Sequence, residues 1–582
     1  MNEAQPTTTE ERVSPEAAGH TPGEEQLWQF VSRLDEEWTR GRTQLIKEDA
    51  WEDNEKQYWG EQWDANLPSF KLPIVVNELK TLILNEVSDL TDTPLTIYVH
   101  KAGQRDAQVE KSLQAFWKNE QVDLSVMQAA LDSMIFPAGF LMCTAELQRD
   151  GTYAVRVRAM DPRKVFPDPD GDCEETCRGF LVKDVLDLVQ IREQWPERGL
   201  RVKPDDGYSL KSSETQTPWW NIFAKFGSAN YKGPLSAPGI GAQMMGYLKA
   251  RACVLTLFLY DDATEEDIQV KKDAQGQAIL DAEGNEQLVI KMLKKYPNGR
   301  MIVAANGVVL FDGPYPYEGP FPIIRVIAEP TTHQFWVTTP PVQSVKELQR
   351  ASNKLDSLVV ENGIRLNNGM IVADTDSGLR PGQTAGLPGQ VLLKRTGTQI
   401  SVTYPPPMPP DMVQAGSRMR EMMAKVLGWA QGRMGLGQRG NVSAELTETE
   451  ISQAMGLTRL RARLLHASVQ KLVTQIFYRM AQYYTVPRYI PSLGVGSLEL
   501  LQWSPIASTE GYGVHVDPAS FMLRSKTMLQ RLTLQLAKMG KVSTKYLLTT
   551  LEMPDAEQEA ARADQELAQT LELKRRQQRK TP

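Results

Sequence analysis

Residues 429–445 read W-A-Q-G-R-M-G-L-G-Q-R-G-N-V-S-A-E, a glycine-rich basic stretch between two strongly helical patterns. Loops that join helices are normally much shorter. Gly435–Gly440 matches GxGxxG, but a dinucleotide site needs a strand before this pattern and an acidic residue about 20 residues after it. Here a helical pattern comes first, and the acids Glu448 and Glu450 come too early. These positions argue against a cofactor loop.

The glycines of this loop indicate backbone mobility, because glycine adopts conformations closed to other residues. Its two arginines, Arg433 and Arg439, are then candidate contacts to a polyanion or to a neighbouring subunit, and the sequence leaves both open. A connector without a role of its own is the alternative.

The patterns on both sides of the loop predict helices. Apolar residues at alternating spacings of three and four predict helices over Val342–Asn367 and Met412–Leu427. The second carries one apolar face, formed by Ala415, Met419, Met422 and Val426. After the loop, Thr447–Tyr484 predicts a long helix with a kink at Gly456. Short strands are expected between the first two helices, at Met370–Ala373, Val391–Leu393 and Ile400–Thr403.

The rest of the chain reads as a mixture of helices and strands. Residues 1–24 predict a solvated tail, and 25–340 one α+β domain with an irregular insertion at 200–245. Helices are expected within that domain at Glu25–Glu48, Val75–Val87, Val109–Trp117 and Asp123–Ile135. Asp150-Gly151, Asn298-Gly299 and Asn306-Gly307 are typical hairpin turns. A strand at Gly513–Asp517 precedes a helical C-terminus.

The bulk composition restricts the class of protein. The chain has 582 residues, of which 41% are hydrophobic and 24% charged, as in ordinary globular proteins of several domains. No apolar run reaches membrane-span length, and the polar N-terminus lacks a signal-peptide pattern. The net charge of −7 argues against tight binding of nucleic acid by the whole chain but allows local basic patches.

Candidate metal and catalytic motifs are weak. Asp168–Asp172 begins like a calcium loop, but Cys173 and Gly179 stand where glycine and glutamate are required. Cys173 and Cys177 have CxxxC spacing without further nearby ligands, which favours free thiols. The five histidines are scattered and no triad or phosphate loop appears. We therefore expect no catalytic site, no metal and no cofactor.

Several short motifs occur in an order that resembles tailed-bacteriophage portal proteins of the P22-like kind, over roughly residues 50–565. They are Tyr58–Trp63 (YWGEQW), Pro73–Asn77, Asp161–Pro169, Tyr296–Arg300, Gly319–Pro322, Gln349 with Asn353, Lys538–Ser543 and Met553–Glu557. The order of helix, small β insert, helix, basic glycine loop and long helix is similar as well.

The resemblance implies a predominantly helical α+β portal fold that assembles as a ring of twelve copies. Its parts would be a flexible tail (1–24), a wing (25–340), stem helices (341–367 and 411–428), a clip (368–410), a tunnel loop (429–446), a long kinked helix with further wing (447–520) and a helical crown (521–582). The ring would occupy one capsid vertex of the virion, after synthesis in the host cytoplasm.

The resemblance also implies partners and contact residues. Double-stranded DNA would pass through the ring during packaging and ejection, and the large terminase subunit, a head–tail adaptor and the major capsid or scaffolding protein would dock on it; no membrane is involved. Channel candidates are Arg418, Arg420, Lys425, Arg433 and Arg439, and clip candidates are Lys394 and Arg395. The alternatives are another virion structural protein, either a minor capsid protein or an adaptor, and a nucleotide-binding enzyme built on GxGxxG.

Overall fold

The structure is a computed structural model, and its contacts divide the chain into two compact units. It describes residues 22–45, 48–63, 71–92, 95–148, 151–171, 176–205, 250–270, 288–331, 336–367, 370–377, 395–397, 399–404, 406–429, 455–494, 497–506, 508–518, 526–551, 559–560, 562–563 and 565. Unit 1 comprises 1–46, 160–323 and 332–335, and unit 2 comprises 47–159, 324–331 and 336–582. The range 25–340, expected to be one domain, thus contributes to both units.

Unit 1 is built on an antiparallel sheet of five strands in the order β11-β10-β7-β6-β5. The bounds are β5 Val165–Pro167, β6 Gly179–Asp187, β7 Arg251–Leu259, β10 Arg300–Ala305 and β11 Val308–Pro314. Asn306 and Gly307 both have positive φ, 41° and 86°, in the tight turn between β10 and β11, which confirms the expected hairpin. A separate two-stranded ribbon joins β8 (Thr264–Val270) to β9 (Leu288–Lys294).

Helices cover both faces of this sheet because its strands are apolar on both sides. On one face, Val31 and Trp38 of α1 (Pro22–Leu45) pack in one cluster with Leu181, Leu257 and Ile302. A second cluster joins Leu188 and Ile191 of α6 (Leu188–Gln194) to other residues of the same strands. Short 3-10 turns, η1 (Pro162–Lys164) and η2 (Gly199–Arg201), complete the unit.

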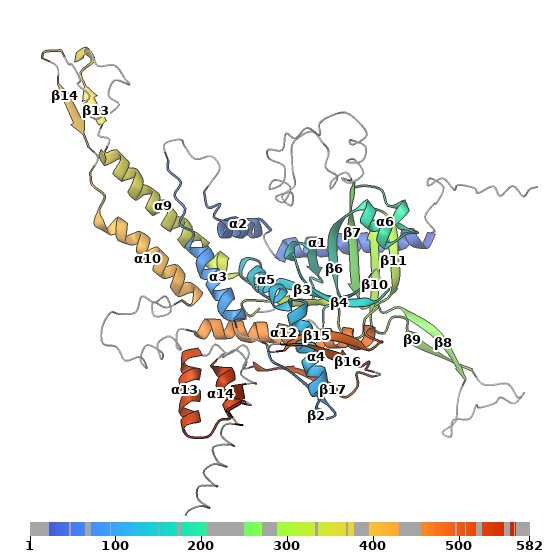
Figure 1. The fold of residues 1–582 in the computed structure, drawn as a ribbon. Coiled ribbons are helices and arrows are strands. Elements are labelled where there is room, and N and C mark those ends of the chain that lie inside the picture. Colours follow the sequence, from blue (N-terminus) through green and yellow to red (C-terminus); the bar gives the residue numbers. More distant parts are fainter. Residues whose placement is uncertain are drawn as a thin grey trace, which may run out of the picture. The chain divides into compact units, whose positions relative to one another are not determined.

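Unit 2 is mainly helical (Figure 1). Its N-terminal helices are α2 (Glu48–Trp59), α3 (Glu78–Thr91), α4 (Ala107–Asn119) and α5 (Val122–Ile135). Two three-stranded sheets, β12-β3-β4 and β17-β1-β2, pack among the helices. Their bounds are β1 Ile97–Lys101, β2 Gln104–Arg105, β3 Gly139–Leu147, β4 Tyr153–Met160, β12 Ile323–Val326 and β17 Tyr512–Val516.

The part of unit 2 that positions the candidate site is a pair of long helices. α9 (Pro341–Asn367) and α10 (Pro410–Leu427) run side by side, and the ribbon of β13 (Met370–Ala373) and β14 (Ile400–Thr403) lies at one end of the pair (Figure 1). α12 (Gly456–Tyr483) follows, and then β15 (Arg488–Gly494), β16 (Ser497–Trp503), α13 (Lys526–Lys538) and α14 (Thr544–Thr550), with η4 at Thr375–Ser377.

Most expected elements of unit 2 are confirmed, with two differences. The helices before the loop, the strands at Met370 and Ile400, and the strand near Gly513 are present. The strand expected at Val391–Leu393 lies outside the described residues. Of the long helix expected over Thr447–Tyr484, α12 covers Gly456–Tyr483 with Met455 as N-cap, and residues 447–454 before the expected kink lie outside the described residues. The helix expected from Val75 is wrong in its first residues, because 71–77 is not helical and α3 begins at Glu78.

Candidate functional site

Prolines and a glycine set the two ends of α10. Pro409 is the N-cap, with φ −58° and ψ 138°, and Pro410 is the first helical residue, where a missing N–H costs nothing. At the other end Gly428 has φ 88° and its N–H donates to Lys425 O, while the N–H of Trp429 donates to Ala424 O. These two bonds form a Schellman motif. The chain therefore leaves α10 in a fixed left-handed turn.

The three cations of α10 fall into two groups. Arg418 and Lys425 are exposed and lie two turns apart on one face, separated by about 10 Å. Arg420 instead pairs with Glu78 of α3, with 3.0 Å from Nε to Oε1, and with Asp356 of α9. Of the expected channel residues on this helix, Arg420 is thus held inside the subunit, whereas Arg418 and Lys425 present their charges to solvent.

The pKa of Glu78 reflects opposing effects of burial and of its charged neighbours. Burial raises the pKa of Glu78, attraction to Arg420 lowers it, and repulsion by Asp356 raises it again, with a net upward shift. The ion pair with Arg420 therefore does not fully offset the cost of moving the carboxylate out of water, because Arg420 also serves a second carboxylate.

The apolar face expected on α10 is only partly in the core. Met422 and Val426 are each 47% exposed. The buried face is instead formed by Gly416, Met423, Ala424 and Leu427. At Gly416 an added Cβ would make only an ordinary contact with α9, 3.4 Å from Asp356 Oδ1. The apolar spacing of α10 thus predicted one buried face, but in the structure the face next to it is buried.

The end of α10 and the start of α12, which flank residues 430–454, lie close together. A Cβ added to Gly428 would lie 3.1 Å from Cβ of Leu457, so the last turn of α10 touches the first turn of α12. Trp429 is buried beside this contact. The chain leaves at Trp429 and is described again from Met455. Arg433 and Arg439 lie outside the described residues.

A buried charge cluster lies next to the end of α10 and the start of α12. The side chains of Arg461 on α12 and Glu86 on α3 are each 2% exposed, with 3.0 Å between Nη1 and Oε1. The same Nη1 donates to Leu427 O at 3.1 Å, and Nη2 reaches Oε1 of Glu329 at 3.4 Å. Thr458 donates its hydroxyl to the second oxygen of Glu86 at 3.1 Å. Nothing in the sequence analysis singled out this cluster.

A second polar array explains why 71–77 is not helical. Side chains spaced four residues apart on α9 accept backbone N–H groups of this segment and of α3. The bonds are Gln349 Oε1 from Leu79 (3.1 Å), Asn353 Oδ1 from Val76 (3.2 Å), Ser357 Oγ from Ile74 (3.1 Å) and Glu361 Oε1 from Leu72 (3.2 Å). Gln349 also donates to Val76 O at 2.6 Å. The available signal was the buried polar series in α9, of which Gln349 and Asn353 had been noted as a motif.

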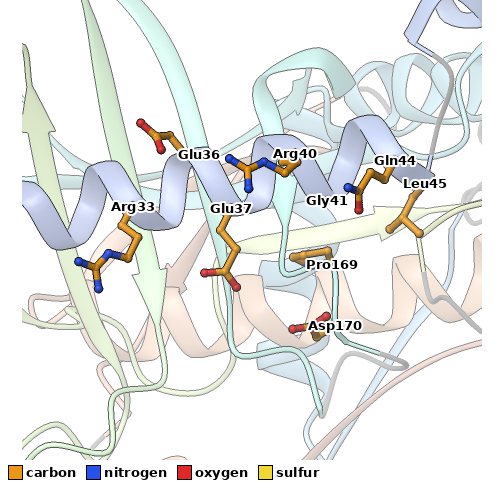
Figure 2. Close-up of a pocket in the computed structure, with 9 residues that line it drawn as sticks. All are labelled: Arg33, Glu36, Glu37, Arg40, Gly41, Gln44, Leu45, Pro169 and Asp170. Carbon is orange, nitrogen blue, oxygen red and sulfur yellow. The ribbon is translucent and has the colours of Figure 1, made fainter.

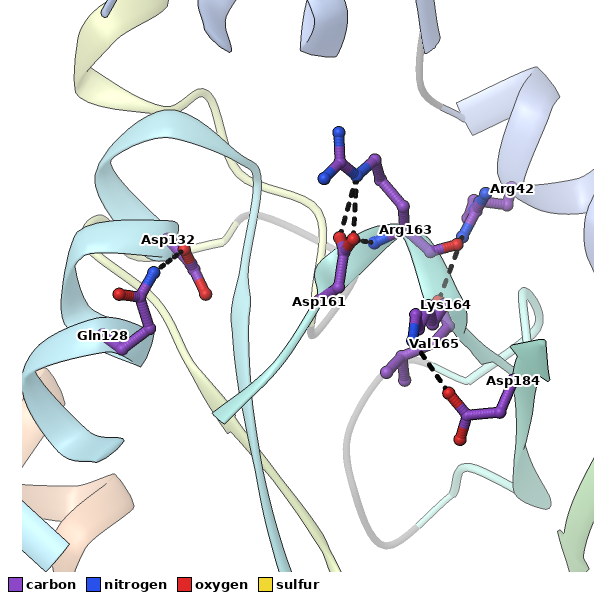
Figure 3. A network of polar contacts seen from close by, with 8 residues as sticks. All are labelled: Arg42, Gln128, Asp132, Asp161, Arg163, Lys164, Val165 and Asp184. Atoms are coloured by element: carbon purple, nitrogen blue, oxygen red, sulfur yellow. Dashed lines mark hydrogen bonds and ion pairs between the residues drawn. The ribbon is translucent and has the colours of Figure 1, made fainter. Parts of the chain in front are cut away.

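Two other motifs, Asp161–Pro169 and the acidic stretch that begins at Asp168, have structural roles in unit 1. In Asp161–Pro169, Arg42 of α1 donates to the carbonyls of Arg163 and Val165 (Figure 3). Its guanidinium also lies 3.5 Å from the Phe166 ring centroid. Asp168 is buried and accepts from the backbone N–H groups of Asp170 and Arg178. Its carboxylate thus closes a turn. Among the described residues no cluster of His, Cys, Asp and Glu could hold a metal ion.

A surface groove of about 540 Å³ lies in unit 1 between α1 and the turn at Pro169 (Figure 2). Its charged residues are mixed in sign and include Arg33, Glu37, Arg40 and Asp170. Mixed charges without a buried unpartnered group do not define a ligand. Of the two clip candidates, Arg395 is exposed, and Lys394 lies outside the described residues.

Comparison with known proteins adds one match. The family model for the phage P22-like portal protein matches residues 31–494, well over half of the chain. No curated protein matches the chain. Within the described residues, no helix has the length and apolar character needed to cross a membrane.

Proposed function

Because the chain belongs to the phage P22-like portal protein family, we propose that twelve copies form the portal ring of a tailed bacteriophage. The ring stands at a unique capsid vertex and serves as the channel for DNA packaging and ejection. The observation that carries the proposal is the family match across the helix–ribbon–helix unit of α9, β13, β14 and α10.

The charge pattern supports a conduit that passes DNA without holding it. Twelve copies would carry a net charge of about −84 from −7 each, a repulsive background for a polyanion. Each exposed cation would recur around the ring, and each neutralised phosphate adds salt-dependent affinity. Arg418 and Lys425 on α10 and Arg433 and Arg439 in the loop would give a few narrow basic rings, enough to guide a strand and too few to trap it.

The remaining parts follow the same plan. Residues 25–340 with part of 447–520 would form the wing, 341–367 and 411–428 the stem, 429–446 the tunnel loop and 521–582 the crown. The clip at 368–410 would receive the large terminase subunit during packaging and the head–tail adaptor afterwards, with Lys394 and Arg395 as candidate contacts. The chain itself would perform no chemical step, since a terminase ATPase would drive the DNA.

Electron microscopy of the purified full chain tests the assembly. We expect rings with a central hole, and mass measurement should give twelve copies. A stable monomer at the concentrations of capsid assembly would contradict the proposal.

The loop is tested with the double variant Arg433→Ala/Arg439→Ala. Rings should form as before, and the DNA packaged or retained per particle should fall. The matched control is Arg459→Ala, an arginine outside the loop near the start of α12, which should leave DNA retention unchanged. If the loop variant instead fails to form rings, the two arginines contact a neighbouring subunit.

A further inference from the structure

The cluster around Arg461 joins three elements at the point where the loop begins and ends. Its guanidinium contacts the last helical carbonyl of α10, the carboxylate of Glu86 on α3 and Glu329 after β12, all from the first turns of α12. A cation is favourable at this place because carbonyl groups at a helix C-terminus carry partial negative charge. One side chain therefore connects Leu427, at the end of α10, with the first turns of α12.

Stability alone does not explain a buried pair of this kind. The desolvation of Arg461 and Glu86 offsets much of the free energy gained from their attraction. Apolar pairs of similar volume therefore often stabilise a protein as much. The charged pair adds a fixed geometry, because the planar guanidinium donates to its acceptors at set angles. An apolar pair could fill the same volume without fixing Leu427 O.

We propose that Arg461 is a positioning residue for the loop, which holds the end of α10 against α12 through Leu427 O and Glu86. Together with the Gly428–Leu457 contact it fixes the end of α10 and the start of α12, the two described elements on either side of residues 430–454. In the proposed ring, every copy would then present the two residues that flank this segment, Trp429 and Met455, in the same position. That last consequence rests on the proposed function, whereas the local clamp does not.

The test uses the full chain with Glu86→Leu/Arg461→Met, which removes both charges and keeps an apolar filling. Amide hydrogen exchange is followed at Gly428 and Trp429, whose N–H groups close the end of α10. The reference amides are Ile74 and Val76, which are bonded to α9 in the same unit. We expect exchange at Gly428 and Trp429 to rise at least tenfold relative to the reference amides, with the urea unfolding midpoint unchanged.

Two further variants keep the proposal open to refutation. Arg461→Lys retains the charge but not the planar guanidinium. It should give a smaller rise in exchange at Gly428 and Trp429, even if the double variant does not fold. Thr458→Val removes one bond to Glu86 but leaves Arg461 on Leu427 O, and it should leave exchange at the α10 end unchanged. Unchanged exchange in the folded Arg461 variants, or an equal rise at the reference amides, would overturn the clamp.

The same samples separate this proposal from the assembly. Absence of rings in the unmodified chain would contradict the portal ring and leave the exchange comparison valid. Rings that persist in a variant with faster exchange at the α10 end, together with lower DNA retention, would support both.

Discussion

Asn353 of α9 accepts the backbone N–H of Val76, with 3.2 Å between Oδ1 and N, and this bond is one rung of an antiparallel ladder. Four residues of helix advance about 6.0 Å, and two residues of extended chain advance about 6.7 Å. Because these repeats nearly match, side chains at every fourth position of α9 can meet N–H groups at every second position of the extended segment. A helix face here takes the place of a partner strand.

Replacing Asn353 with Leu should lower the free energy of unfolding by about 2–4 kcal/mol, because it removes the acceptor of the Val76 N–H and the donor to Oε1 of Gln62. Urea denaturation of the full chain measures this change. The neighbouring exposed residue provides the control: Lys354→Ala should change stability by less than about 0.5 kcal/mol. Equal effects of the two substitutions would contradict the ladder.

The cations of α10 should separate into a structural and a functional group. Arg420→Ala leaves Glu78 and Asp356 facing each other without a counter-ion, so we expect a loss of about 1–3 kcal/mol in the free energy of unfolding. Arg418→Ala should leave thermal unfolding unchanged and lower DNA retention. A thermal melt and a packaging assay on both variants measure the difference, and a large destabilisation by Arg418→Ala would show that it also has a partner.

Gly428→Ala should destabilise the chain by about 1–2 kcal/mol, because Gly428 has φ 88° and the new Cβ would press on Leu457. Gly456→Ala is the matched control across the loop, since that glycine starts a helix and has open space around it. It should be neutral or slightly stabilising. Chemical denaturation of both variants compares them, and a neutral Gly428→Ala would contradict the left-handed turn.

Cys143 should make stability depend on pH in the alkaline range. Burial raises the pKa of this thiol from 9.0 to about 12, and Arg479 opposes the shift only in part. Below pH 9 the thiol is protonated in both the folded and the unfolded state, so its full contribution to the free energy of unfolding is present. Between pH 9 and 12 the unfolded thiol ionises and the folded one does not, so stability falls with rising pH.

The measurement compares the unmodified chain with Cys143→Ala at pH 8 and pH 10. From pH 8 to pH 10 the unmodified chain should lose about 1.4 kcal/mol more of its free energy of unfolding than Cys143→Ala does. The folded thiol should also resist alkylation at pH 8, whereas Cys253, which is partly exposed, should react. A difference independent of pH would show that the Cys143 thiol ionises equally in both states.

The local elements of the helix pair could be predicted because their signals are local. The 3–4 spacing in α9, the prolines before α10 and the glycine after it mark helix ends within a few residues. The helix expected from Val75 begins at Glu78 instead. The extended conformation of Val75 depends on acceptors some 280 residues away along the chain, and no local pattern reports them.

The sequence determined the long helices α9 and α10 and most of their ends, because propensity and capping act over a few residues. The family followed from the order of short motifs and agrees with the match over 31–494. Only the tertiary structure decided that Arg420 is paired while Arg418 is exposed, and that Met423 rather than Met422 is buried. It also brought Arg461 of α12 onto the last carbonyl of α10. Each of these outcomes depends on which face of a helix its neighbours cover, and that is set by contacts between segments far apart in the chain.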